Sequence, residues 1–230
     1  MTTGTALSAL LDDYVHNDIR LTAANKLTYL TLGQQRIVRD SPTSIFVKQA
    51  TISVTVAIGR EYSLASDFHM MQAIWLQTQG WKLDPMGDAE FIETVERIPT
   101  IPSGPPRMYT ILGFDESQGT PAFRIRFDYT PDASYTVTYW YYYMPGTLTG
   151  SATPALSAMG FDELLLWATA MIILQQKDPT GYASAVQQYQ ACLDTFKSYR
   201  PMGPDYTPLF RPQSNDYRPR VGWLGPHFPN

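Results

Sequence analysis

The sequence predicts an α+β fold: a helical bundle of two N-terminal and two C-terminal helices, an inserted antiparallel β-sandwich or barrel-like domain, and an extended C-terminal tail. Three observations predict it. Apolar residues recur at helical spacing near both ends of residues 7–200, they alternate every second residue in the middle, and prolines crowd the end of the chain. The expected boundaries are 1–43 and 146–200 for the bundle, 44–145 for the β domain and 201–230 for the tail.

The N-terminal helices are predicted from apolar spacing and from capping residues. A second helix is expected from Leu21 to Arg39, with Asn17 or Asp18 as its cap, and Ser41-Pro42 ends it because a residue before proline avoids the helical region. The first helix rests on apolar residues at the i, i+3, i+4, i+7 and i+8 positions: Leu7, Leu10, Leu11, Tyr14 and Val15.

The middle of the chain reads as short strands between turn signals. From Ile45 the period changes, and Ile52, Val54 and Val56 alternate with polar residues as in a half-buried strand. Without a long helix between the strands, an antiparallel sheet is expected. Residues Glu90 to Ile98 fit either a strand or one to two helical turns. The further strands are predicted at Ala73–Gln79, Trp81–Pro85, Arg107–Phe114, Phe123–Tyr129 and Tyr135–Met144.

The segment Tyr135–Met144 carries aromatic residues at both alternating positions, so both of its faces are expected to be covered. Two interpretations stay open: a central strand between the core and a packed helix, or burial at a subunit interface. After the linker 145–158, Leu164 to Leu174 is apolar almost all round and predicts a central helix. Asp178 and Pro179 then start a last helix, which Pro201 closes.

The tail combines two properties that rarely occur together. Seven prolines from Pro201 onward forbid a helix and favour an extended chain, which could reach roughly 90 Å. Its large apolar groups are too many for an ordinary disordered tail, so we expect it to order on another subunit or partner, or else to pack back on its own domain. The residues expected to bind the partner are Tyr206, Phe210, Arg211, Tyr217, Arg218, Arg220, Trp223 and Phe228.

Composition narrows the function classes. Charged residues make up 17%, against about 25% in typical soluble domains, which hints that much of the surface is covered by other chains. A net charge of −4 argues against a protein that grips nucleic acid. The single cysteine, Cys192, rules out an internal disulfide. The N-terminus lacks the features of a signal peptide and no apolar run is long enough to span a membrane, so we expect no membrane association.

No residue pattern predicts a catalytic or metal site, and we expect neither an enzyme nor a cofactor. His16, His69 and His227 lie in three separate regions, and Cys192 is expected to be a small core residue. No phosphate-binding loop or serine nucleophile motif is present. The acidic residues Asp84, Asp88 and Glu90 resemble a calcium loop only loosely, so a hairpin turn is the favoured interpretation there.

Three sequence segments, with the helix pair broken at Lys177-Asp178-Pro179, carry a resemblance to a known family. The first is Arg60-Glu61-Tyr62-Ser63-Leu64-Ala65-Ser66-Asp67-Phe68, the second Gln79-Gly80-Trp81-Lys82-Leu83, and the third runs from Pro131-Asp132-Ala133-Ser134-Tyr135 through the aromatic strand to Pro145. The chain thereby resembles the head-to-tail adaptor (connector) proteins of short-tailed bacteriophages. It departs from their typical Tyr-x-Leu-Pro-x-Asp-Phe pattern at Ala65, where they usually have proline.

The resemblance implies a homo-oligomeric ring, usually of twelve copies, made in the host cytoplasm and located in the virion neck. In such a ring the portal protein binds one side and the tail nozzle or tail proteins bind the other. Double-stranded DNA passes through without sequence-specific binding. The C-terminal tail then becomes the segment that reaches into the portal.

Two other function classes stay open at this stage. A carbohydrate- or receptor-binding β module of a virion tail would use exposed aromatic residues such as Trp75, Trp81 or Trp140. An enzyme with an unrecognised site is the third class.

Overall fold

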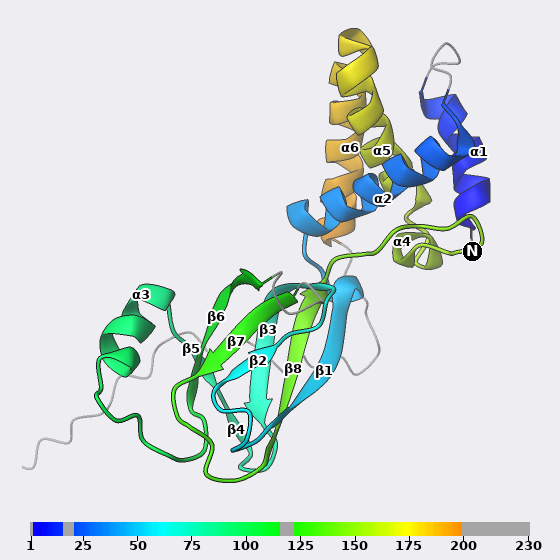
Figure 1. Ribbon diagram of the computed structural model, residues 1–230. Coiled ribbons are helices and arrows are strands. Elements are labelled where there is room, and N and C mark those ends of the chain that lie inside the picture. The colour runs from blue at the N-terminus through cyan, green and yellow to red at the C-terminus, as the bar shows by residue number, and fades with distance from the viewer. Residues whose placement is uncertain (1, 16–20, 116–121, 199–230) are drawn as a thin grey trace, which may run out of the picture. The chain divides into compact units, whose positions relative to one another are not determined.

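The computed structural model describes residues 2–15, 21–115 and 122–198 (Figure 1). The described helices are α1 (Gly4–Tyr14), α2 (Ala23–Asp40), α3 (Asp88–Phe91), α4 (Ala155–Ala158), α5 (Asp162–Lys177) and α6 (Pro179–Ser198), with a 3-10 turn η1 (Ser44–Phe46) and a π-helical turn η2 (Ile92–Glu96). The described strands are β1 (Val47–Val54), β2 (Glu61–Ser63), β3 (Phe68–Leu76), β4 (Trp81–Lys82), β5 (Asp84–Pro85), β6 (Met108–Asp115), β7 (Ala122–Phe127) and β8 (Tyr135–Tyr143).

The four long helices predicted from the sequence are present, with one change at the start of α2. Its cap is Thr22, whose hydroxyl accepts a hydrogen bond from the Asn25 N–H at 3.2 Å. Leu21 therefore lies outside the helix, and the suggested caps Asn17 and Asp18 lie outside the described residues. The Asp178 cap is confirmed, because its carboxylate accepts from the Thr180 N–H at 3.0 Å.

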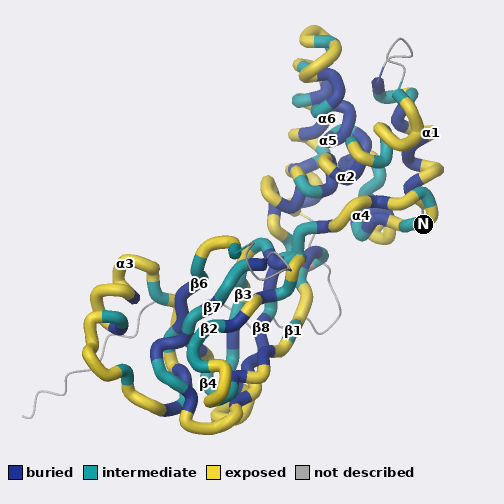
Figure 2. The backbone as a smooth tube through the Cα atoms, in the orientation of Figure 1, coloured by how far each residue is buried: buried dark blue, intermediate teal, exposed yellow. Residues whose placement is uncertain are grey.

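The α5 helix lies at the centre of the helical core, as its apolar sequence predicts. Most of its residues are buried, in contrast to the largely exposed α3 (Figure 2). A glycine on α2, Gly33, lets that helix approach α5 so closely that a Cβ on it would clash with the hydroxyl of Thr169. The helical core also takes residues from α1 and α6, including Leu7, Leu11, Leu193 and Phe196.

The strands form two separate sheets of four, not one sheet and not a closed barrel, among the residues described. Their orders are β1-β8-β3-β4 and β2-β7-β6-β5. The barrel-like alternative is therefore wrong, because each sheet ends in strands with a partner on one side only. The expectation of purely antiparallel pairing is also wrong, since β5 pairs with β6 in parallel at Asp84–Met108 and Pro85–Tyr109. Side chains from both sheets share one hydrophobic core.

Several predicted strand boundaries are wrong for identifiable reasons. The third strand begins at Phe68, not Ala73, because register shifts after Phe68 and after Met71 break the two-residue alternation that would reveal it. The three-residue strand β2 is too short to show a period. The chain passes from the first sheet to the second between β4 and β5, so Trp81–Pro85 is not one strand. Asp88 begins α3, and β5 pairs with β6 in parallel, so the hairpin turn expected at Asp84 to Glu90 is also wrong.

The β8 strand connects the two cores. Tyr135, Val137, Tyr139 and Tyr141 on one face are buried in the core shared by the sheets. At its end, Tyr143 packs against the helical core and lies 6.0 Å from the ring of Phe46, which is fully buried there. On the other face Thr136 is exposed and Trp140 half-buried, so that face is only partly covered. The predicted domain boundaries stay a prediction.

Candidate functional site

Two of the segments that carry the family resemblance meet in the fold around Asp67. Its carboxylate accepts hydrogen bonds from the Tyr141 hydroxyl at 2.8 Å and from the Lys48 ammonium at 2.6 Å. The same ammonium lies 4.1 Å from the centroid of the Tyr143 ring. Burial works to raise the pKa of Asp67, but the hydrogen bonds from Lys48 and Tyr141 outweigh it and lower the pKa below its ordinary value. The arrangement joins β1, β8 and the segment before β3.

The position at which this chain departs from the adaptor pattern makes a second contact to β8, two residues before Asp67. The Ala65 N–H donates a hydrogen bond to the Tyr139 hydroxyl at 3.0 Å. A proline has no N–H and could not make this bond. Alanine at this position therefore has a specific use in this chain: its N–H ties the turn before β3 to the central strand β8.

Charged side chains on the second sheet are used to hold its own elements together. Arg60 lies 2.9 Å from Glu96, and Arg126 contacts both Glu96, at 3.3 Å, and Glu61. Arg124 pairs with Asp115 at 2.9 Å. These pairs join β2 and β7 to η2. The guanidinium groups of this cluster thus have protein carboxylates as partners.

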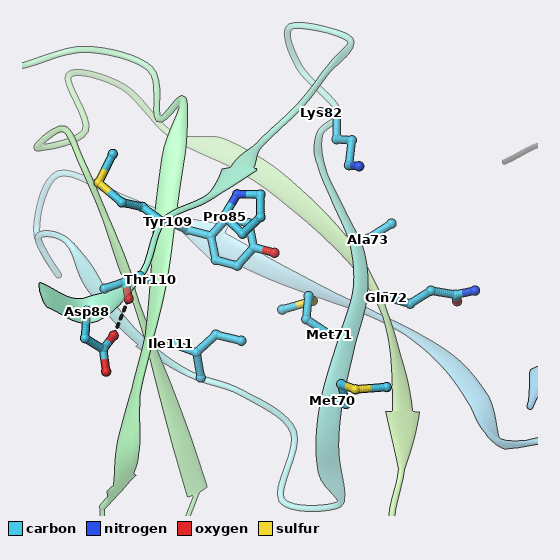
Figure 3. A pocket seen from close by; sticks show the side chains of 12 residues that line it. Met70, Met71, Gln72, Ala73, Lys82, Pro85, Asp88, Tyr109, Thr110 and Ile111 are labelled. Atoms are coloured by element: carbon cyan, nitrogen blue, oxygen red, sulfur yellow. Dashed lines mark hydrogen bonds between the residues drawn. The ribbon is translucent and has the colours of Figure 1, made fainter. Parts of the chain in front are cut away.

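An open recess lies between the two sheets on the side where they end in β4 and β5. It has a volume of about 490 Å³, and Tyr109 and Ile111 from β6 face Met71 from β3 across it (Figure 3). Burial first, and then the nearby Asp84, raise the pKa of Tyr109 to about 12. Asp88 at the margin accepts a hydrogen bond from Thr110. The lining is mainly apolar, and its methionines can adapt in shape to an occupant.

A second surface feature lies at the other edge of the sheets, where β1 leads to β2. Val56, Ala57 and Ile58 are three consecutive exposed apolar residues, with Val56 55% and Ile58 61% exposed. We call residues 55–59 the apolar tip. Short runs of this kind in contact with water are unusual unless they serve a function.

The tryptophans considered for glycan binding do not form an exposed platform. Trp75, Trp81 and Trp140 are all half-buried. The Trp81 ring packs against the core of the sheets, and its indole N–H donates to the Pro106 carbonyl at 3.2 Å. Trp75 stands opposite the fully buried Thr138, diagonally next to Trp140, on the outer face of the first sheet.

Within the described ranges no group of three or more His, Cys, Asp or Glu side chains is placed to hold a metal ion. Cys192 packs half-buried against the helical core, as predicted, and burial together with Glu163 raises the pKa of its thiol. His69 lies on β3, while His16 and His227 fall outside the described residues. No helix in the described part of the chain is long and apolar enough to cross a membrane.

The eight tail residues predicted to bind a partner all lie outside the described residues, so they stay a prediction. Sequence reasoning did not find the recess, because its lining comes from three separate segments, and one of them is a strand whose alternation is broken by register shifts. The apolar tip did carry a signal, since Val56-Ala57-Ile58 is an apolar run directly before Gly59. Val56 also continues the alternation of Ile52 and Val54, and this strand pattern masks the run.

The described part of the chain is a mixed α+β protein with six helices and two sheets. The chain belongs to the SU10 adaptor protein family, whose model matches residues 1–211. This membership makes it a phage structural adaptor, with a virion location and other phage structural proteins as partners. The match extends past α6 and includes Tyr206, Phe210 and Arg211 of the tail. No curated protein matches the chain.

Proposed function

We propose that the chain is the subunit of an adaptor ring in the phage neck that joins the portal to the tail nozzle and lines the DNA channel. The observation that carries the proposal is the family match over residues 1–211. The net charge of −4 agrees with a channel through which DNA passes without being held. Twelve copies is the number that the resemblance to connector proteins implies.

Residues 201–230 are the proposed portal anchor. Phe210, Trp223 and Phe228 supply apolar groups that a partner's pockets can bury, and Arg211, Arg218 and Arg220 supply cations for its carboxylates. Aromatic and arginine residues are the types that dominate binding energy at interfaces. The match reaches Arg211, so the family model includes the first part of this segment.

The test mixes the purified full chain with the portal protein of the same phage and measures the mass of the product. We expect a complex that contains a ring of adaptor copies, whether or not the chain alone is monomeric. Deletion of Leu209 to Asn230 should abolish the complex, and Phe210→Ala with Arg211→Ala should weaken it about tenfold or more. The matched control is Phe114→Ala, at a half-exposed phenylalanine of β6. If the full chain forms no complex with the portal protein, the proposal is refuted.

The glycan-binding alternative has less support, because all three tryptophans are half-buried and Trp81 is held by a hydrogen bond and by the core.

A further inference from the structure

The apolar tip is a preorganised projection. The hydroxyl oxygen of Tyr62 accepts a hydrogen bond from the Thr55 N–H at 2.8 Å. The same hydroxyl can donate a hydrogen bond to the carbonyl oxygen of Thr55, at 3.0 Å, or to that of Gly59, at 2.9 Å. Gly59 has φ +85°, a conformation that favours glycine. Tyr62 is itself buried in the core of the sheets. The loop is therefore fixed in shape before it meets any partner, which lowers the entropic cost of binding.

The tip has the chemistry of a group that leaves water on binding. Val56 and Ile58 are stiff β-branched side chains, so little rotamer freedom is lost when they are buried. No charged residue occurs from Gln49 to Gly59. An apolar recess of a few side chains' volume is the complementary surface.

The same chain carries such a recess at its opposite edge. The order of the sheets puts β1 and β2 at one end and β4 and β5 at the other. The tip connects the first pair of strands, and the recess is bounded by the second pair together with β3 and β6 (Figure 3). Because projection and recess lie at opposite edges, one copy cannot join them within itself.

We propose that the apolar tip of one copy seats in the recess of the next copy. A head-to-tail contact of this kind uses two different surfaces of each subunit, and it forms a ring when the rotation from one copy to the next closes after a whole number of copies. Val56 and Ile58 pack against Met71 and Ile111, while Lys82 and Asp88 remain at the margin. The inference deepens the proposed function, on which it rests for the assembly of several copies, by naming the contact between them.

The experiment cross-links full-length chains in the absence of portal. In a Cys192→Ser background, Ile58→Cys protein is mixed at high concentration with Met71→Cys protein under mild oxidation. We expect mixed disulfide dimers in at least about tenfold excess over either self-dimer, and a ladder of larger products from the chain that carries both cysteines. Leu10→Cys, at an exposed leucine of α1, replaces Ile58→Cys as the matched control and should give background yield.

A second variant separates contact from folding. Val56→Asp added to the Ile58→Cys protein should reduce the mixed dimer about tenfold or more, with no change in thermal unfolding, because the side chain is exposed. If the yield of mixed dimer is no higher than with Leu10→Cys, the inference is overturned, and the apolar tip would then bind a protein of another sequence. Portal binding by the unmodified chain is measured separately, so a failure of the contact between copies can be told apart from a failure of portal binding.

Discussion

The helical core and the core of the two sheets are both apolar, but the contacts that position their elements differ. Around α5 the contacts are apolar and close, to the point that Gly33 on α2 has no room for a methyl group. Between the sheets and their connecting segments, the specific contacts are polar, as in the bonds from Tyr139 and Tyr141 to the turn before β3. The difference teaches that one added methyl group should be costly where α2 meets α5, and that the loss of one polar atom should be costly at the turn before β3.

The largest effect is expected at Phe46, which belongs to both regions because it is fully buried in the helical core and contacts Tyr143 of β8. Phe46→Ala should lower the free energy of unfolding by about 3–5 kcal/mol, through lost burial and the cavity left behind. Chemical denaturation followed by circular dichroism measures it. The same change at Phe114, which is 50% exposed, should cost less than about 1.5 kcal/mol, and equal costs would contradict the assignment of Phe46 to the core.

The second prediction concerns the contact between α2 and α5. Gly33→Ala adds one methyl group that would clash with Thr169. Although alanine favours a helix more than glycine does, we expect the free energy of unfolding to fall by about 1–3 kcal/mol. Thermal and chemical unfolding measure the loss. Adding Thr169→Ala removes the clashing hydroxyl and should restore a large part of the stability. If the single variant is more stable than the original chain, the close approach of the helices is not tight in solution.

The third prediction moves to the polar region. Tyr139→Phe leaves the volume of the core nearly unchanged but takes away the hydrogen-bond acceptor of the Ala65 N–H. We expect Tyr139→Phe to lower the free energy of unfolding by roughly 1 kcal/mol. This value is at the low end for an unpaired buried donor, because Ala65 is only half-buried. In an Ala65→Pro background, which restores the adaptor pattern and removes the donor, the same change should cost measurably less. A cycle of the four chains, followed by denaturation, tests this, and equal costs in both backgrounds would refute the role of the bond.

The sequence predicted the helical region better than the β region. The signal of a buried helix is local, whereas the pairing of strands depends on distant segments. The run from Leu164 to Leu174 is apolar all round, and such a helix can only be central, so its burial followed directly. Strand β3 was found only in part, because two bulges hide its alternation, and the parallel pairing of β5 depends on contacts between distant segments. The recess has no local signal for that reason.

The tail shows the limit of local reasoning about a site. Its prolines and aromatic residues predict a need for a partner, but nothing within residues 201–230 specifies which surface receives them. The apolar tip differs, because its fixing hydrogen bonds come from Tyr62 four residues beyond Ile58, and the run Val56-Ala57-Ile58 could have been noticed. A signal of three residues is outweighed, in sequence alone, by the strand pattern that precedes it.

The smallest expected effect is a pH dependence confined to the polar region. The lowered pKa of Asp67 means that its contribution to stability is present above the unfolded-state pKa of about 3.9 and is lost as the pH falls through the folded-state pKa. Asp67→Asn should therefore cost below about 1 kcal/mol at pH 7, because both partners are partly exposed, and less still at pH 3. Denaturation of the two chains at both pH values measures the difference.

Gly33→Ala is the matched comparison, since its effect on the free energy of unfolding comes from volume and should be the same at pH 7 and pH 3. A cost of Asp67→Asn that does not fall with acidification would show that the contact around Asp67 works through packing, and the contrast between the two regions would then be lost.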